Sequence, residues 1–393
     1  MAKPAIAIFG AAPLDFQGGG EFSARQMAEH WAGQGYPVTY ITESEAGGTV
    51  RPPSSPGAAA AGFAVRNLPF RRRRSLPGGI AVDQALPPPE AFATQPVNLL
   101  MLFRVPPPDY LAQLATLPTA IVLLFHGISV ESGTHPDPRV VLYRWHQRRR
   151  LGKGAAALAA RNIYIQVLTE RTAAYLRELG VPPRKVFLIP TGIDTSAYRV
   201  EDAAAPFQVL FVGRLEKLQK GTHRLLRILR KAERSGRGTL RFVVAGRGAE
   251  LEALRRGTRG LDQVEIRGFV PEAEKRELLA RSHLFLVTSN VEPYSISAVE
   301  GLASGLPVVA TPAAGPEFLL GQDPLFGRLG SFAPAELLRL IEEYRLRWST
   351  DPAAYLAERR ARRTRAVALF DREGMFTKFD ALIEEVMGGP TSG

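Results

Sequence analysis

The chain of 393 residues is 45% hydrophobic, enough for two domains that each bury a core, which excludes a disordered protein. No apolar run approaches the roughly 18 residues that span a bilayer, and the absence of cysteine excludes disulfides and thiolate metal sites and suits a cytoplasmic protein. Lys and Arg outnumber Asp and Glu by 50 to 38, so the net charge of +12 favours an anionic partner: nucleic acid, a phosphorylated substrate or an acidic membrane face.

In the first half of the chain, short apolar runs alternate with amphipathic stretches, a pattern typical of βαβ units around a parallel sheet. The N-terminal apolar segment contains Pro4 and is followed by Asp15, so it predicts a buried strand rather than a secretory signal. A helix is predicted over residues 21–35. The strands predicted for this first doubly wound domain are residues 5–11, 37–42, 97–103, 120–127 and 163–169.

The pattern begins again near residue 205, after a Pro- and Ala-containing stretch that reads as a linker. The second doubly wound domain has a predicted helix over residues 220–236 and predicted strands at 207–213, 240–246, 264–270, 283–289 and 306–311. Residues 43–96 are rich in Pro, Gly, Ala and Arg and are predicted to form long loops rather than core. The domains expected are residues 1–204, residues 205–368 and a C-terminal helical segment over residues 369–393.

In each predicted domain, the loop after the first strand contains residues suited to binding a phosphate group. Gly18, Gly19 and Gly20 precede a predicted helix, whose N-terminal N–H groups favour an anion, although an ordinary strand-to-helix turn explains three glycines equally well. Arg214 and Lys220 follow the first strand of the second domain, at the edge where open α/β sheets bind ligands. A guanidinium and an ammonium together suit a diphosphate, and the alternative is a solvated basic turn.

The stretch EPYSISAVE, from Glu292 to Glu300, places an acid on each side of a predicted helix start. The helix is expected from about Ser295, so the N–H groups of Tyr294, Ser295 and Ile296 would form an anion pocket beside Glu292. A carboxylate next to a phosphate is unfavourable unless it accepts hydrogen bonds from hydroxyls, which sugars supply. The alternative is that both acids only cap the helix dipole.

The histidines and acids do not predict a metal centre. His126 ends an apolar strand, where a structural role and a site role are both open. The other histidines show no metal-binding spacing, and the sequence has no Asp-x-Asp motif. Arg214 and Lys220 would then neutralise the charge that a divalent ion neutralises elsewhere.

Together these motifs resemble those of the family-four glycosyltransferases, retaining enzymes of the GT-B fold. The resemblance depends on six segments in the order of the family, above all the acid pair with seven residues between. These segments are GGGEF at 18–22, FHG at 125–127, LIPTGID at 188–194, VGRLEKLQKG at 212–221, VVAGRGAEL at 243–251 and EPYSISAVEGLASGLPVVAT at 292–311.

The resemblance implies two Rossmann-like domains that face each other across a cleft, with the C-terminal helix crossing back to the N-terminal, acceptor-binding domain. It also implies a UDP- or GDP-sugar donor, no metal and no other cofactor. Arg214, Lys220, the N–H groups of Ser295 and Ile296, and Gly18 or Gly19 would hold the diphosphate. Glu300 would bind the ribose, Glu292 and His126 the donor sugar, and backbone near Phe269 and Val270 the base.

The sequence departs from the pattern of the family at three positions, and it follows that pattern only loosely over residues 313–332. Tyr294 and Ser295 replace the usual Phe-Gly after the first Glu-Pro, which leaves the donor sugar open. Arg247 stands where an aspartate is common. The Glu317 position fits the family.

The acceptor-binding part of the chain combines arginine clusters with aromatic residues. Residues 67–79 and 143–154 contain Phe70 and Trp145 among basic residues, which suits a lipid-linked acceptor or peripheral contact with an acidic membrane, on the inner face of the plasma membrane. A solvated arginine-rich loop is the alternative. The function expected is hexosyl transfer to a saccharide or lipid-linked acceptor in cell-envelope glycan synthesis. The rival classes are a GT-B epimerase or phosphorylase, a catalytically silent member that only recognises or scaffolds, and a basic nucleic-acid-binding protein, although nucleic-acid binding leaves the acids unexplained.

Overall fold

The computed structural model describes residues 3–10, 19–44, 63–69, 74–76, 80–83, 98–103, 105–126, 128, 130, 135–234 and 239–388. The chain folds into two compact units. The first unit consists of Met1–Val130, Trp145–Ile189 and Phe376–Gly393, and the second of Glu131–Arg144 and Pro190–Met375. The predicted domain bounds at 204 and 368 stay a prediction.

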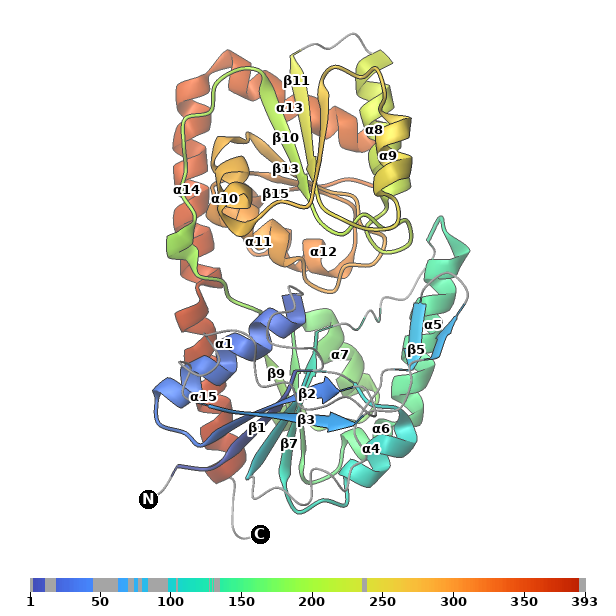
Figure 1. Ribbon diagram of the computed structural model, residues 1–393, viewed down its shortest axis with the longest axis vertical. Helices are drawn as coiled ribbons and strands as arrows, with labels where there is room; N and C mark the ends of the chain where they lie inside the picture. The colour runs from blue at the N-terminus through green and yellow to red at the C-terminus, as the bar shows by residue number, and fades with distance from the viewer. Residues whose placement is uncertain are drawn as a thin grey trace. The chain divides into compact units, whose positions relative to one another are not determined.

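The first unit is built on a seven-stranded parallel sheet in the order β3-β2-β1-β6-β7-β8-β9 (Figure 1). Its central strands are buried on both faces, so they read as continuous apolar runs in the sequence. The strands are β1 (Ile6–Phe9), β2 (Val38–Ser44), β3 (Ala64–Pro69), β6 (Leu99–Leu102), β7 (Ala120–Phe125), β8 (Ile163–Val167) and β9 (Val186–Leu188). The helices of this unit are α1 (Gly19–Gly33), α4 (Pro108–Leu114), α6 (Ala155–Leu158) and α7 (Glu170–Glu178). Helix α5 (Pro138–Lys153) belongs to the second unit up to Arg144 and to the first unit from Trp145.

The second unit is built on a six-stranded parallel sheet in the order β12-β11-β10-β13-β14-β15. Helices α8 and α13 pack together over one face, whereas α11 packs against α14 (Figure 1). The strands are β10 (Phe207–Val212), β11 (Leu240–Ala245), β12 (Val264–Gly268), β13 (Leu284–Val287), β14 (Val308–Ala310) and β15 (Gly327–Leu329). The helices are α8 (Thr222–Arg234), α9 (Leu251–Gly257), α10 (Glu272–Arg281), α11 (Ile296–Ala303), α12 (Ala314–Gly321), α13 (Pro334–Thr350) and α14 (Pro352–Phe370).

The strand order reverses direction once in each sheet, between β1 and β6 and between β10 and β13. Open parallel sheets bind ligands outside the carboxyl ends of the strands at such a reversal, because the loops there diverge to opposite faces. The loop after β10 carries Arg214 and Lys220, and the loop after β13 carries Glu292. The topology of the second unit therefore brings the residues predicted to bind phosphate and sugar to one sheet edge.

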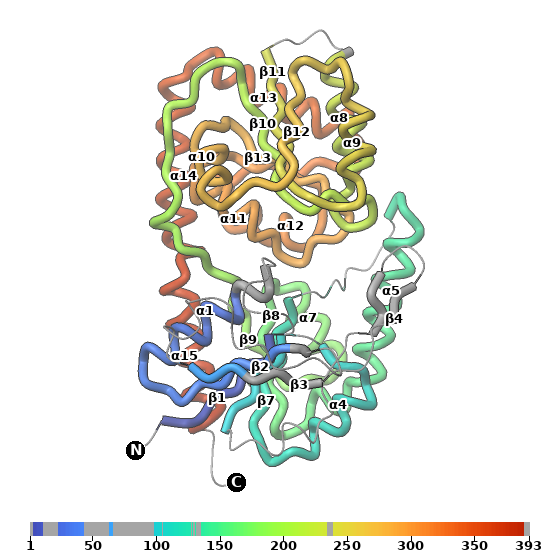
Figure 2. The backbone as a smooth tube through the Cα atoms, in the orientation of Figure 1, coloured from blue at the N-terminus to red at the C-terminus, as the bar shows by residue number. Residues whose placement is uncertain are grey.

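The C-terminal helix α15 (Arg372–Gly388) packs on α1 of the first unit, which confirms the predicted return to the N-terminal half (Figure 2). Trp31 is fully buried and donates from Nε1 to Asp380 Oδ1 at 2.8 Å. The Trp31 ring meets Phe379 edge-on, and His30 stacks on Phe376 with 3.9 Å between ring centroids. These aromatic contacts lie on the buried face of α15, which also carries Leu382, Ile383 and Val386.

The prediction that residues 43–96 form only loops is wrong in part. β3 pairs with β2 in parallel along residues 64–69, and β4 (Arg74–Leu76) pairs with β5 (Ile80–Asp83) as a separate antiparallel ribbon. β3 is an edge strand with one neighbour, so it needs no strong apolar alternation, and Pro69 lies at its last position, where proline is tolerated.

In the described parts of the chain, no helix is long and apolar enough to cross a membrane.

A buried histidine couples the stability of the second unit to pH. His283 lies before β13 and is 1% exposed; one ring nitrogen accepts from the N–H of Gln208 at 2.9 Å, and the other lies 3.1 Å from the carbonyl oxygen of Ala203. Burial lowers the pKa of His283 from 6.5 to about 4, and the Arg359 charge acts in the same direction. The folded chain therefore keeps this ring neutral where the unfolded chain protonates it.

Between pH 6.5 and about 4, the free energy of unfolding should fall by about 1.4 kcal/mol per pH unit for this group, because the unfolded state binds the additional proton. The contribution of His283 is complete above pH 6.5 and is lost as the pH falls. Urea denaturation of wild type and His283→Gln across this range checks it. The variant should be less stable at pH 7 but have a shallower pH slope, and equal slopes would contradict the assignment.

Candidate functional site

The loops after β10 and β13 are joined to each other by their backbones. The N–H groups of Asn290 and Val291 donate to the carbonyl oxygen of Gln219 at 2.7 and 3.2 Å, and Thr288 Oγ1 donates to the carbonyl oxygen of Lys220 at 2.9 Å. Gly221 has a φ of +65°, and a Cβ there would lie 2.1 Å from the carbonyl oxygen of Thr288. Only glycine allows this close approach, which fixes Lys220 beside the second loop.

This arrangement brings the Lys220 ammonium onto the Glu292 carboxylate as a sheltered ion pair. Their side chains are 16% and 9% exposed, and Lys220 Nζ donates to Glu292 Oε2. Ser289 Oγ donates to the same carboxylate oxygen at 2.9 Å. An ammonium has three N–H donors, so Lys220 retains donors for a second anion while it holds Glu292 in place.

Arg214 lies on the same loop but contacts different groups. Its guanidinium donates to Glu216 Oε1 at 3.0 Å and to Gln219 Oε1 at 2.6 Å, and the side chain is 62% exposed. The structure thus brings Lys220 and Glu292 together and leaves Arg214 at the exposed side of the same loop. A long, exposed Arg side chain reaches a ligand by a rotamer change of modest energy.

Two residues that the sequence did not single out brace the loop before Glu292. Arg224 on α8 is 4% exposed and donates to the carbonyl oxygens of Thr288 at 2.6 Å and Phe332 at 2.8 Å, and to Asn290 Oδ1 at 2.9 Å. Arg144 lies in the N-terminal half of the sequence but belongs to the second unit of the structure. It donates to the carbonyl oxygen of Asn290 at 3.2 Å. Burial and the Arg227 charge lower the pKa of Arg224 to about 10, so it stays charged at pH 7. No local pattern in the sequence signals these long-range contacts.

Helix α11 begins at Ile296, and its N-cap residue Ser295 has an unusual backbone. Ser295 has φ 81° and ψ 72°, the left-handed region, and no side chain caps the first turn. The first N–H groups of a helix have no partners within it, so they offer donors to an anion. No acid lies in this first turn to compete with one.

The conformation of Ser295 explains why glycine is usual at this position in the family resembled. A non-glycine residue costs about 1 kcal/mol or more in this region, because Cβ approaches the following carbonyl. Ser295 is 4% exposed, and among the described residues its hydroxyl has no hydrogen-bond partner. The serine therefore strains the backbone and buries an unpaired hydroxyl.

Ser295→Gly should be more stable than Ser295→Ala by about 1 kcal/mol, because both variants lose the hydroxyl but only glycine relieves the strain. Chemical denaturation of both variants measures the difference. Ser304 is the matched control, since it follows α11 as its C-cap, is fully buried and has an unpartnered hydroxyl among the described residues, but has φ −88°. Ser304→Ala should be at least as stable as Ser304→Gly. If the glycine variant were the more stable at both positions, backbone strain at Ser295 would not explain the difference.

Tyr294 lies at the start of the same turn as a buried anchor. It is 3% exposed, and its hydroxyl donates to the carbonyl oxygen of Thr191 at 2.9 Å. Burial raises the pKa of the Tyr294 hydroxyl. The side chain that replaces the usual phenylalanine thus uses its hydroxyl within the protein.

Glu300 is held inside the second unit by two partners that sequence reasoning missed. Tyr198 donates its hydroxyl to Glu300 Oε1 at 2.9 Å, and Lys275 on α10 donates to the same oxygen at 2.7 Å. Burial raises the pKa of Glu300, against the opposing effect of Lys275 and Tyr198. The second oxygen of the carboxylate has lone pairs that can accept a hydroxyl. The sequence does not predict this pair, because 25 residues separate Lys275 from Glu300.

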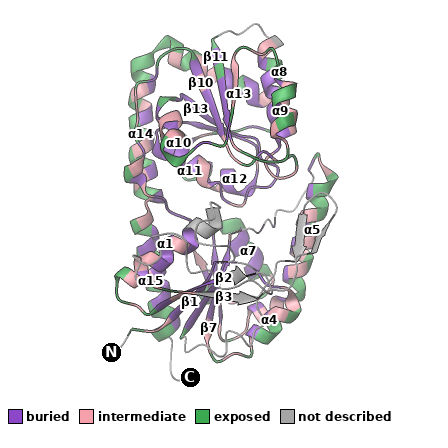
Figure 3. Cartoon of the chain, viewed as in Figure 1, coloured by how far each residue is buried: buried purple, intermediate pink, exposed green. Residues whose placement is uncertain are grey.

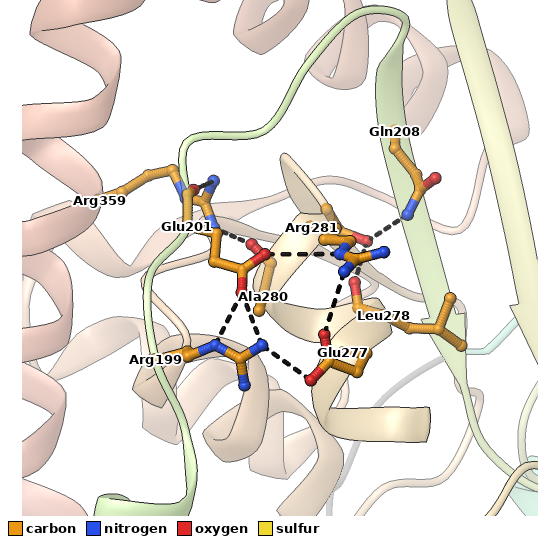
Figure 4. A network of polar contacts seen from close by, with 9 residues as sticks. Arg199, Glu201, Gln208, Glu277, Leu278, Ala280, Arg281 and Arg359 are labelled. Carbon is orange, nitrogen blue, oxygen red and sulfur yellow. Dashed lines mark hydrogen bonds and ion pairs between the residues drawn. The ribbon is translucent and has the colours of Figure 1, made fainter. Parts of the chain in front are cut away.

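A surface network fixes the position of α10, the helix that carries Lys275 (Figure 4). Arg199 donates to Glu201 and Glu277, each at 2.7 Å, and Arg281 lies 3.5 Å from both acids. Arg359, which is 2% exposed, donates to the carbonyl oxygens of Glu201 at 2.9 Å and of Ala280, on α10, at 3.1 Å. The exposed pairs contribute little each, whereas the buried guanidinium fixes the end of the helix.

The residues predicted to meet the base lie just after β12. Phe269 is 51% exposed and lies against the guanidinium of Arg247, 5.2 Å from the ring centroid, whereas Val270 is 9% exposed. Arg247, the residue that departs from the pattern of the family, thus has a partner in the exposed Phe269 ring.

The predicted site residues of the first unit are described only in part. His126 lies at the end of β7, 3.1 Å from Gln166 Oε1, and burial lowers its pKa to about 4, so the ring is neutral at pH 7. Gly19 and Gly20 are the first residues of α1, and Gly18 lies outside the described residues. Among the described residues, no group of three His, Asp or Glu could hold a metal ion.

Comparison with known proteins matches both halves of the chain to family models. Residues 17–197 match "Glycosyltransferase Family 4", and residues 206–337 match "Glycosyl transferases group 1". Among curated proteins, the chain is 30% identical over 169 residues to one polypeptide of the phosphatidylinositol N-acetylglucosaminyltransferase of Arabidopsis thaliana, covering 42% of this chain and 37% of that protein. It is 30% identical over 200 residues to a glycogen synthase of Mycobacterium tuberculosis, covering 49% and 47%. The chain thus spans about half or less of these relatives.

Solved structures match nearly the whole chain at low sequence identity. A sucrose-phosphate synthase from Thermosynechococcus elongatus matches with a TM-score of 0.74 and 19% identity over 99% of this chain and 100% of that one. Alr3699/HepE of Anabaena, in complex with UDP, matches with a TM-score of 0.72 and 16% identity over 97% and 100%. These likenesses confirm the predicted GT-B fold.

Proposed function

The chain belongs to the group 1, family 4 glycosyltransferases, and on this basis we propose that it is a retaining, metal-independent hexosyltransferase. The donor is a UDP- or GDP-sugar, and the acceptor is a hydroxyl of a saccharide or lipid-linked glycan of the cell envelope. The observation that carries the proposal is the sheltered Lys220–Glu292 pair beside the uncapped start of α11. A cation, free N–H groups and a carboxylate in one place fit a diphosphate joined to a sugar.

In this proposal, Lys220 and the first N–H groups of α11 bind the diphosphate, and Arg214 joins them from the exposed side of its loop. Glu292 accepts hydrogen bonds from hydroxyls of the donor sugar, and Glu300 accepts from the ribose. Phe269 and Val270 provide the surface for the base. Gly18, Gly19, Gly20 and His126 contribute from the first unit, the neutral His126 ring as a hydrogen-bonding group rather than a cation.

The reaction breaks the bond between the anomeric carbon and the diphosphate oxygen while the acceptor oxygen bonds to that carbon on the same face. The proton of the acceptor goes to the departing phosphate oxygen, so the products are the glycoside and a nucleoside diphosphate. No separate general base is required. Lys220 and the helix N–H groups stabilise the charge that develops on the leaving group, and this is the main contribution of the protein.

Relatives support a sugar-nucleotide donor but differ in acceptor. Solved structures of low identity include complexes named with UDP and UDP-glucose, and the curated relatives include glycogen synthase and a putative colanic acid biosynthesis glycosyltransferase. We base the proposed cell-envelope role, and a location on the inner face of the plasma membrane, on the basic and aromatic residues of the N-terminal, acceptor-binding part of the chain.

The test is a panel of UDP- and GDP-sugars with the full-length chain in EDTA, read by thermal shift and by slow donor hydrolysis. A donor at 100 times its Kd should raise the free energy of unfolding by about 2.7 kcal/mol. Stabilisation that depends on the sugar, together with release of the nucleoside diphosphate, is expected. Salt-sensitive RNA binding with no donor preference would instead indicate a nucleic-acid-binding protein.

A further inference from the structure

Helix α5 presents an exposed apolar surface. Val141, Leu142 and Trp145 are 39%, 59% and 53% exposed, three of the eight large apolar side chains exposed in the described part of the chain. Their spacing of three and four residues places them on one face. The opposite face is buried, through Val140, Arg144, Gln147 and Leu151. Figure 3 shows the exposed residues along this helix.

The same face continues into basic residues. Arg149 lies one turn beyond Trp145, with its guanidinium 5.3 Å from the centroid of the Trp145 ring, and Lys153 lies one turn further at the end of the helix. Between Asp137 and Glu170 the sequence has no acid, and its basic residues are Arg139, Arg144, Arg148, Arg149, Arg150, Lys153 and Arg161.

Arg148 lies on an adjacent face of α5, and its guanidinium contacts two neutral groups. Its guanidinium donates to the carbonyl oxygen of Val130 at 2.9 Å and lies over the ring of Tyr175, 4.1 Å from the centroid. Neither partner carries a charge, so the positive charge of Arg148 adds to the field that attracts an anionic surface.

We propose that the face of α5 formed by Val141, Leu142, Trp145, Arg149 and Lys153 docks on an anionic lipid bilayer. An exposed Trp beside aliphatic side chains suits the boundary of headgroups and acyl chains, where its ring is buried and its N–H stays wet. Arg and Lys one and two turns along the helix reach lipid phosphates while their stems cover apolar surface. A nucleic acid would be matched by the cations but not by Leu142 and Val141. The surface does not depend on the proposed reaction.

The test uses the full-length chain with phosphatidylcholine vesicles, with and without phosphatidylglycerol. Of the three tryptophans, Trp31 is fully buried and Trp348 packs partly buried against the core of the second unit, so a change in emission on binding reports mainly Trp145. Wild type should float with the anionic vesicles and show a blue shift, and neutral vesicles should give neither.

The variant Leu142→Ser/Trp145→Ser should bind anionic vesicles at least about tenfold more weakly in flotation, with an unchanged Tm because both side chains are exposed. Arg149→Gln and Lys153→Gln should each weaken binding about fivefold and reduce its salt dependence. Leu346→Ser is the matched control, since Leu346 is 52% exposed on α13 in the second unit, and it should bind like wild type.

Failure of wild type to bind anionic vesicles, equal binding by the double variant, or the same blue shift with single-stranded RNA would each overturn the proposal. Donor binding, measured on the same preparations, should be unchanged in the double variant. A negative vesicle result with intact donor binding would therefore reject the membrane surface, and with it the proposed membrane location, without affecting the proposed sugar transfer.

Discussion

Glu292→Gln should lower kcat for sugar transfer by about a thousandfold, while the Kd for the nucleoside diphosphate changes by less than about threefold. The amide keeps the size of the carboxylate but loses the charge that strengthens hydrogen bonds from the hydroxyls of the donor sugar. The nucleotide does not contact this residue in the proposed arrangement. Initial rates with a saturating donor, and calorimetric titration of the diphosphate, measure the two quantities separately.

The control for this change is Glu343→Gln, which neutralises a 37%-exposed surface carboxylate paired with Arg328 and Arg339. It should leave both kcat and the Kd unchanged. An unchanged kcat in Glu292→Gln would contradict the role assigned to Glu292. A loss of nucleotide binding as large as the loss of rate would place Glu292 on the diphosphate instead of the sugar.

The sequence predicted the two sheets well, because their central strands are buried on both faces and appear as apolar runs. Because Lys220 follows the first strand of the second domain, the sequence placed it at the carboxyl edge of that sheet. It placed Glu292 only before a helix start, and the structure shows that both residues follow strands at the reversal of the strand order. The start of α11 was predicted within one residue, at Ser295 instead of Ile296. These features depend on local pattern and topology, which a single sequence contains.

The sequence did not reveal the contacts that hold the site in shape. Arg224 and Arg144 brace Asn290 from 66 and 146 residues away, and Lys275 meets Glu300 from another helix. Such pairs leave no periodic signal, and in a chain this rich in arginine, no basic residue stands out by its type. The edge strand β3 was missed for a related reason, since one neighbouring strand suffices to hold it.

The strained Ser295 shows a different limit. Its departure from the usual glycine was visible in the sequence, but its conformational cost depends on the φ of 81° that only the structure supplies. The substitution could have been accommodated by a change of backbone. Instead, the backbone is retained and the serine bears the strain, as expected where the surrounding loops are fixed on both sides.

Lys220→Met should lower kcat/KM by about a thousandfold and weaken binding of the nucleoside diphosphate by about tenfold to a hundredfold. The ammonium is more sheltered than the other cation of the proposed diphosphate site, with 16% of its side chain exposed against 62% for Arg214. It contributes one charge-assisted hydrogen bond to binding and more in the transition state, where the leaving group gains charge. Pre-steady-state rates and calorimetric titration separate these contributions.

The same change leaves Glu292 without its cation in a site where its side chain is 9% exposed, so it should also destabilise the fold by about 3 kcal/mol. The double variant Lys220→Met/Glu292→Gln removes both charges and should recover most of that stability without recovering binding of the nucleoside diphosphate. Lys217→Met, on the same loop but exposed, should alter neither property. If the double variant regained binding of the nucleoside diphosphate, the loss in Lys220→Met would come from misfolding, and the ammonium would have no part in binding the diphosphate.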